Sequence, residues 1–314
     1  MAAKKELQEL VEFLNSPRQE VQRAAVDLVE GLTGSVDGLE QLMTQADVLL
    51  RALLRLIAGD AGTSKAALHS LINLSQREDA VRQLVELKVV GRIIDYLIEG
   101  SSRHAELLVM LLSNVTVSDA ACEQMLQTGS RSVAGFNIAV LLKRFLDSQS
   151  EQPDPYQHMA LVLTNLTRQR PGRQLLLEPG KGTFGALASQ LRAPSALRRK
   201  GCANAIRNCC FCAEEDGTLG AVLGDAPALE ALLDALCGVT GPKEQDSEAR
   251  AALAESVELL VATDAGGQVL WDLKAPEMLR QGYKTEEDLE VCASMERTAN
   301  LFLAESGAVK EVTE

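Results

Sequence analysis

The sequence predicts an all-α fold built from stacked helical repeats, and three observations support that prediction. Leu, Ala, Glu and Gln are abundant in the 314 residues, while aromatic residues make up only 3%. Helices favour the first group, whereas strands favour aromatic and β-branched residues. A short phrase centred on asparagine also recurs along the chain, and each copy ends an apolar pattern of helical period.

The recurring phrase sets the length of one repeat. Its strong copies are Ile72–Ser75, Ser113–Thr116, Thr164–Thr167, Arg207–Cys210 and Ala299–Phe302. With weaker copies near 31 and 259, the anchors fall at 31, 73, 114, 165, 208, 259 and 300, with spacings of 42, 41, 51, 43, 51 and 41. A period just above 40 is typical of armadillo and HEAT repeats. We therefore predict an armadillo/HEAT-like, right-handed superhelical solenoid of about seven repeats, forming one domain over residues 1–314.

Within one repeat the pattern predicts three helices, near 79–87, 89–98 and 103–116. Gly100, Ser101 and Ser102 between the last two form a helix stop followed by a cap. Three helices favour armadillo over the two-helix HEAT unit. The two long spacings require insertions, which we place in the loop-rich segments near 147–155 and 241–247.

The third helix of each repeat lines the concave groove of such stacks, so the groove is the expected partner-binding surface. A row of carboxamides there can hydrogen-bond the backbone of an extended partner chain. An equally plain interpretation is that each asparagine bonds the loop after its own helix and only shapes the repeat. The candidate groove residues are Asn73, Asn114, Asn165, Asn204, Arg207, Asn208 and Asn300.

Charge marks a second candidate surface. Residues 165–210 contain nine Lys or Arg and one acid, for a net charge of +8 in a chain whose net charge is −13. This basic stripe could bind an acidic partner segment, or its arginines could simply cover repeat surfaces. Its main candidates are Arg168, Arg170, Arg173, Arg198, Arg199 and Lys200. Nucleic acid is a poor fit, because the stripe lacks interleaved aromatics and the whole chain is acidic.

Nothing in the sequence points to catalysis. Three histidines, the absence of phosphate-loop, dinucleotide-binding and H-E-x-x-H motifs, and the absence of a C-x-x-C pair predict no catalytic residue, no metal and no cofactor. Cys202, Cys209, Cys210 and Cys212 are expected to be buried free thiols between repeats. The longest apolar runs are far below the roughly 20 residues that span a bilayer, and no apolar signal core follows the N-terminus. We expect a cytoplasmic monomer that binds no membrane.

One phrase is more specific than the general repeat pattern. Arg207-Asn208-Cys209-Cys210-Phe211 resembles the R-N-C-C-F signature of the HGH (BRP-like) family, supported by Leu111–Thr116, Leu163–Arg168 and Glu258–Thr263. The resemblance implies an armadillo-type adaptor, not an enzyme, that binds newly made translation elongation factor 2 and helps deliver it to the cytosolic chaperonin and prefoldin. The alternative is a general armadillo scaffold that binds an extended or acidic partner segment in its groove.

Overall fold

Every regular element of the described chain is helical, which confirms the all-α prediction. The computed structural model describes residues 2–99, 103–127, 135–148, 151 and 153–312. The chain divides into two compact units, Met1–Arg144 and Phe145–Glu314. One continuous domain and a right-handed superhelix stay predictions.

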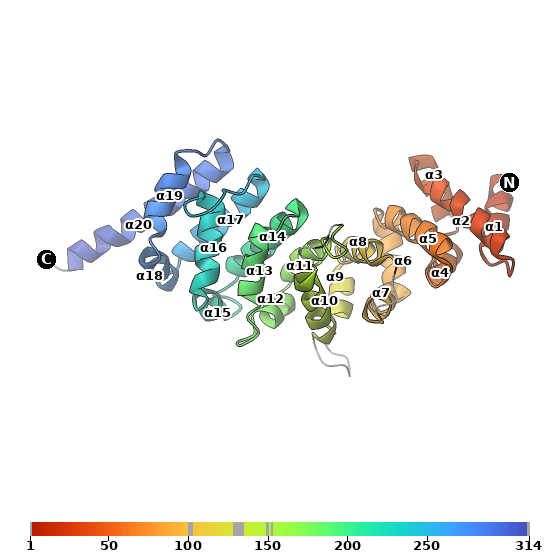
Figure 1. Ribbon diagram of the computed structural model, residues 1–314, viewed down its shortest axis with the longest axis horizontal. Helices are drawn as coiled ribbons and strands as arrows, with labels where there is room; N and C mark the ends of the chain where they lie inside the picture. The colour runs from red at the N-terminus through yellow and green to blue at the C-terminus, as the bar shows by residue number, and fades with distance from the viewer. Residues whose placement is uncertain (1, 100–102, 128–134, 149–150, 152, 313–314) are drawn as a thin grey trace. The chain divides into compact units, whose positions relative to one another are not determined.

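The first unit is a series of short helices in which every third helix packs on its counterpart in the next repeat (Figure 1). α2 packs against α5, and α5 packs against α8. The helices α6, α7 and α8 confirm the three predicted for one repeat; the predicted stop at 100–102 lies outside the described residues. The helices are α1 (Ala2–Leu14), α2 (Gln19–Thr33), α3 (Val36–Met43), α4 (Ala46–Leu56), α5 (Ala61–Leu74), α6 (Glu78–Glu86), α7 (Val89–Ile98), α8 (Ala105–Val115), α9 (Asp119–Leu126) and α10 (Phe136–Asp147), which continues past Arg144.

The second unit repeats the same plan. α11, α14, α17 and α20 pack in succession, each on the next. Its elements are α11 (Met159–Thr167), α12 (Arg170–Leu176), α13 (Thr183–Ser189), the 3-10 helix η1 (Gln190–Arg192), α14 (Ala196–Phe211), α15 (Leu219–Leu223), α16 (Ala226–Cys237), α17 (Ser247–Val261), α18 (Asp264–Asp272), α19 (Ala275–Tyr283) and α20 (Leu289–Val312).

The seven predicted anchors all fall on third helices of these repeats: α2, α5, α8, α11, α14, α17 and α20. The predicted insertion at 241–247 is a loop up to Asp246, where α17 is capped. The other insertion lies between α10 and α11, with residues 149, 150 and 152 outside the described residues. The repeat period read from the sequence therefore identifies the correct helices.

Small side chains let the third helices approach closely. A Cβ added to Gly201 of α14 would lie only 2.5 Å from the Cβ of Ala160 on α11. Cys202, Ala205 and Cys209, on the same helix, are fully buried. Because bulky side chains would push the helices apart, the poverty of aromatics follows from the packing.

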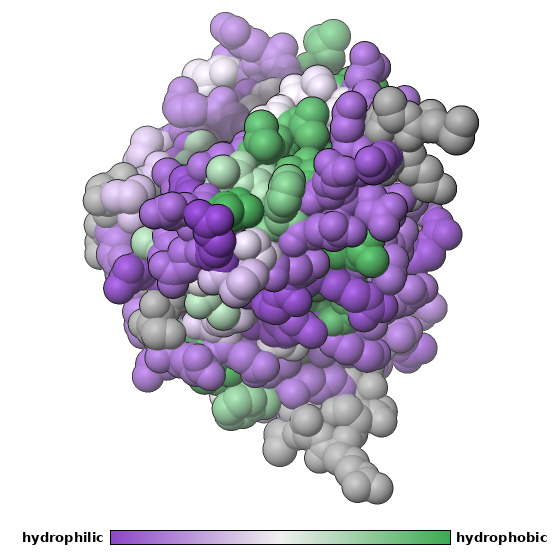
Figure 2. All heavy atoms as spheres, turned by 90° about the vertical axis from the view of Figure 1, so that its right-hand side faces the viewer, coloured by the Kyte–Doolittle hydropathy of each residue, from purple (hydrophilic) through white to green (hydrophobic). Residues whose placement is uncertain are grey.

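The ends of the chain carry some exposed apolar surface. The face that Figure 2 turns toward the viewer is mostly hydrophilic, with separate hydrophobic clusters. In α1 to α4 the large exposed apolar side chains are Phe13, Leu28, Val36 and Val48. Within the described ranges, no helix combines the length and apolar character that crossing a membrane requires.

Candidate functional site

Each unit has its own third-helix surface, formed by α2, α5 and α8 in the first unit and by α11, α14, α17 and α20 in the second, and these surfaces carry the predicted groove residues. On both surfaces the asparagines act first as links between repeats. The Nδ2 of Asn73 donates to Thr33 Oγ1 at 2.9 Å, and that of Asn114 donates to Ser75 Oγ at 2.9 Å. In the second unit, Asn208 donates to Thr164 O and to Thr167 Oγ1, both at 3.1 Å. Each amide therefore holds the end of the preceding third helix.

This geometry differs from the structural interpretation of the sequence, in which each asparagine bonds its own loop. The expected bond to the loop after the asparagine's own helix is replaced by a bond to the previous repeat, about 40 residues earlier in the chain. The reason is that stacking brings the last turns of successive third helices side by side. Asn165 and Asn204 are half-buried on α11 and α14, and Asn300 is exposed on α20. Their partner-binding role stays a prediction.

Arg207, the predicted basic groove residue, is held by a carboxylate of the next repeat. Its Nε and Nη2 lie 2.5 and 2.7 Å from the two carboxylate oxygens of Glu255 on α17. The hydrogen bonds from this pair raise the pKa of the Arg207 guanidinium. One turn later, the ring of Phe211 lies 5.8 Å from the guanidinium carbon and is 61% exposed. Phe211 is thus the more accessible of the two side chains.

The basic stripe is largely neutralised inside the protein. Eight of its nine basic residues form ion pairs, and the partner acids of all but Lys181 lie outside 165–210. Among the described residues, only Arg168 of the nine forms no ion pair, and it is exposed at the C-cap of α11. Although residues 165–210 carry a net charge of +8, most of their basic side chains are therefore already paired with carboxylates of the protein itself.

Arg198 is the clearest correction to the predicted stripe, because its side chain is fully buried. Its guanidinium forms an ion pair with Asp154, and its Nη1 donates to Phe145 O at 2.6 Å and to Gln190 Oε1 at 2.8 Å. Its Nη2 donates to Ser148 Oγ at 2.9 Å, and the group stacks 4.0 Å from the Phe145 ring centre. With its donors satisfied in this way, Arg198 ties the α10–α11 loop to α14 and offers nothing to a partner.

Arg173 is also withdrawn from the surface. Its Nε donates to Asp216 at 2.6 Å, and its Nη1 donates to the carbonyls of Thr167 and Arg168, which end α11. Arg170 pairs with the same aspartate at 3.3 Å. These arginines close the end of α11 and join it to the turn after α14.

Arg199 and Arg250 form one bridge repeated in two successive repeats. Arg199 of α14 pairs with Glu244 at 2.6 Å, and Arg250 of α17 pairs with Glu286 at 2.8 Å. In both cases Nη1 also donates to two carbonyls of the loop before the arginine's own helix. Lys200, next to Arg199, pairs with Glu248 at 2.5 Å.

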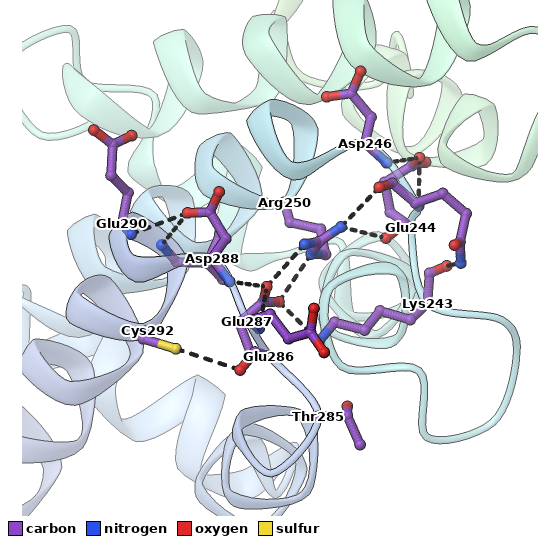
Figure 3. Close-up of polar contacts among 12 residues, drawn as sticks. Lys243, Glu244, Asp246, Arg250, Thr285, Glu286, Glu287, Asp288, Glu290 and Cys292 are labelled. Atoms are coloured by element: carbon purple, nitrogen blue, oxygen red, sulfur yellow. Dashed lines mark hydrogen bonds and ion pairs between the residues drawn. The ribbon is translucent and has the colours of Figure 1, made fainter.

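Each glutamate in these bridges also orders the loop before the next third helix. Glu286 Oε1 accepts hydrogen bonds from the backbone N–H groups of Glu287 and Asp288, and Lys243 Nζ lies 2.8 Å from its other oxygen (Figure 3). Glu244 does the same for Gln245 and Asp246. Burial opposes ionisation of Glu286, but the bonds from Arg250 and Lys243 outweigh it and lower the pKa to about 2.

Glu244 and Glu286 are not among the site residues predicted from the sequence, although the sequence carries a signal for them. Both stand in a Glu-x-Asp phrase, Glu244 to Asp246 and Glu286 to Asp288, directly before a third helix. Neither phrase is basic or rich in asparagine, so a search for a binding groove passes over it.

Three of the four cysteines expected to be buried are so. Cys202, Cys209 and Cys210 are buried free thiols, and burial raises the pKa of Cys202 and of Cys209 to about 12. Cys212 is also a free thiol but is only partly buried, so the expectation is wrong for this residue. Within the described residues, no cluster of three or more histidine, cysteine or acidic side chains is arranged to hold a metal ion.

The amino-acid sequence of this chain is similar to one protein family and to curated proteins from several organisms. The family described as a domain of unknown function (DUF383) matches residues 96–265. A protein named Protein HGH1 homolog from Dictyostelium discoideum is 23% identical over 95% of this chain and 90% of its own length. The Homo sapiens protein of that name is 26% identical over 96% of this chain and 82% of its own length.

Solved structures show the same fold. An engineered protein aligns with a TM-score of 0.76 and 20% identity, over 94% of this chain and 68% of its own. A structure described as computationally designed armadillo repeat proteins for modular peptide recognition aligns with a TM-score of 0.63 and 20% identity, over 81% and 99%. These likenesses confirm the armadillo-type solenoid.

Proposed function

The chain belongs to the DUF383 family, and from that premise we propose that it is a non-enzymatic adaptor for newly made translation elongation factor 2. In this proposal it holds the factor and helps deliver it to the cytosolic chaperonin and prefoldin, and it works in the cytoplasm. The observation that carries the proposal is the similarity to HGH1 homologues over about 95% of the chain. The R-N-C-C-F phrase at 207–211 adds the family resemblance that implies this client.

The third-helix surface of the second unit is the proposed client site. It is a continuous series of packed helices, and stacked repeats present such surfaces to extended partners. The side chains best placed to contact a client are those that internal pairing leaves accessible: Phe211, Asn300 and Arg168. Arg207 and Asn208 are proposed to shape this surface, because their polar groups already bond neighbouring repeats.

A second candidate function is a general scaffold for an extended peptide. It is favoured by the likeness to the designed armadillo proteins, whose title describes modular peptide recognition. Under this proposal the same surface binds a peptide from a different client. The two candidates differ in the identity of the bound protein and share the mode of binding.

Affinity capture from cytosol in low salt, read by mass spectrometry, separates the two candidates. The adaptor proposal expects elongation factor 2 together with chaperonin subunits. Absence of both contradicts it, and reproducible capture of a different protein through the third-helix surface supports the scaffold. Phe211→Ala combined with Asn300→Ala should reduce capture at least several-fold. Phe136→Ala is the matched control, since Phe136 is also exposed, at 53%, but lies on α10.

Charge-reversal variants of Arg207 and Glu255 test whether the client recognises the charge of Arg207. Arg207→Glu alone should destabilise the protein, because two carboxylates then face each other. Adding Glu255→Arg should restore the stability of the fold by re-forming the pair in reverse. If client capture also returns, the orientation of the pair does not matter for recognition; if capture stays low, Arg207 itself contacts the client.

A further inference from the structure

Two cysteines at the end of α14 stand three positions apart. The sequence was expected to lack a C-x-x-C pair, but that expectation is wrong, because the run Cys209-Cys210-Phe211-Cys212 contains one. Cys209 lies in the last turn of α14, and Cys212 is the C-cap that ends the helix. Both are free thiols. Two thiols with this spacing can be oxidised to a disulfide and reduced again, which makes the pair a candidate redox site.

Helix geometry brings the two cysteines within reach of one disulfide. Residues three apart in a helix have Cα atoms about 5 Å apart, inside the range of roughly 4.4–6.8 Å that a disulfide spans. Their Cβ atoms are about 5–6 Å apart, somewhat more than the ~3.5–4.5 Å that the bond needs. Cys212 already has non-helical dihedral angles, φ −115° and ψ 17°, so the end of the helix can adjust by this amount. The adjustment would shift Phe211, which lies between the two cysteines and is 61% exposed.

The two thiols differ in accessibility. Cys212 is half-buried, so a dissolved oxidant can reach it, whereas Cys209 is fully buried. Burial raises the pKa of Cys209 to about 12, and the positive charge of Arg173 acts against that rise. Cys210 is buried on the α17 side, where it shares a hydrogen bond with Ser256. Cys212 is therefore the thiol that reacts first, and Cys209 is the one in reach to complete a disulfide.

We propose that Cys209 and Cys212 form a reversible disulfide that regulates the client site of the second unit. The disulfide follows from the positions of the two cysteines, while its effect on the client rests on the proposed function. Phe211 is one of the side chains proposed to contact the client. In the reduced chain its ring lies beside the Arg207 guanidinium, and closing the last turn takes it out of this position. Oxidation therefore lowers client binding.

The oxidant is a low-molecular-weight disulfide such as glutathione disulfide. The Cys212 thiol gives its proton to water, and its sulfur attacks one sulfur of the oxidant, whose S–S bond breaks. One glutathione leaves as a thiolate and takes up a proton, which leaves Cys212 in a mixed disulfide. The Cys209 thiol then loses its proton, its sulfur attacks the Cys212 sulfur, and the second glutathione leaves in the same way. Two electrons pass from the cysteines to the oxidant, and a dithiol reductant reverses the reaction.

Glutathione disulfide added to the purified, reduced chain tests the disulfide without any client. The remaining thiols are alkylated under denaturing conditions and counted by mass spectrometry. Two of the seven thiols should be lost, and dithiothreitol should restore them. Cys212 that carries glutathione while every other thiol stays free overturns the proposal, and so does a chain in which all seven thiols stay free.

Cys212→Ser should prevent the loss of two thiols, and this variant should keep its fold because the side chain is only half-buried. Cys209→Ala should stop the reaction at the mixed disulfide of Cys212, a result that a purely structural role of Cys209 would not give. Cys210→Ala is the matched control, since it removes the neighbouring buried thiol and should leave disulfide formation unchanged. Loss of two thiols in Cys212→Ser overturns the assignment in favour of other cysteines.

Affinity capture in buffer without reductant measures the effect on the client. The oxidised chain should capture elongation factor 2 several-fold less than the reduced chain, and dithiothreitol should restore capture. Cys212→Ser should capture equally before and after treatment with the oxidant. Equal capture by the oxidised and reduced wild type overturns the regulatory role. Capture by neither form is instead a failure of the proposed function, which the count of thiols separates from a failure of the disulfide.

Discussion

Arg250 of α17 grips the buried carboxylate of Glu286 through two hydrogen bonds of 2.8 Å, although 36 residues separate them in the chain. The same arginine donates to the carbonyls of Glu244 and Gln245, so one guanidinium joins two successive loops. Arg199 and Glu244 form the equivalent bridge one repeat earlier. An equivalent arginine–glutamate pair therefore links each of these repeats to the next one.

Glu286→Gln should lower the free energy of unfolding by about 3 kcal/mol at pH 7, because it leaves Arg250 and Lys243 without their anion. The pKa of Glu286 is lowered from 4.5 to about 2, so its contribution is complete above pH 4.5 and disappears as the pH falls through 2. Urea unfolding at pH 7 and pH 2.5 should show a smaller pH dependence in the variant. Glu287→Gln, an exposed neighbour, should match the wild type; an equal loss there would contradict the assignment.

Arg198→Ala should destabilise the protein by about 3–5 kcal/mol, since it leaves the buried carboxylate of Asp154 without its ion-pair partner. Chemical unfolding followed by circular dichroism measures the change. Arg168→Ala removes the same group from an exposed position without an ion pair and should change stability by less than about 0.5 kcal/mol. Similar values for the two variants would show that burial of Arg198 does not matter for stability.

Asn208→Ala removes two hydrogen bonds to α11 and should cost about 1–2 kcal/mol of stability. Asn300→Ala, at an exposed site, should leave stability within about 0.5 kcal/mol of the wild type. Thermal unfolding of the two variants compares them directly. A large loss in Asn300→Ala would mean that this asparagine is structural as well.

Gly266→Ala in the first turn of α18 should destabilise the protein by about 1–3 kcal/mol, because its Cβ would lie 2.0 Å from the carbonyl oxygen of Leu260 on α17. Gly91→Ala is the contrasting case: no atom lies within 4 Å of its added Cβ, and it sits inside α7. That change should stabilise the protein by about 0.5–1 kcal/mol through helix propensity. Thermal unfolding that ranked the two substitutions in the opposite order would contradict the steric argument.

The fold was predictable from the sequence because repeat period and helical pattern are local properties. The anchors at 73, 114 and 208 mark third helices whether or not their asparagines bind anything. The partners of those asparagines were not predictable, since the bond from Asn208 to Thr167 crosses 41 residues and depends on how the repeats stack.

The sequence by itself determined the helical repeats, their period and the total charge of each segment. Only the tertiary structure decided which charges remain available to a partner. Arg173 and Arg198 lie in the most basic stretch of the chain, yet stacking brings Asp216 and Asp154 to them from about 43 residues away. Because burying a cation without an anion is costly, the repeats meet where opposite charges can pair, and the basic stripe is neutralised within the fold.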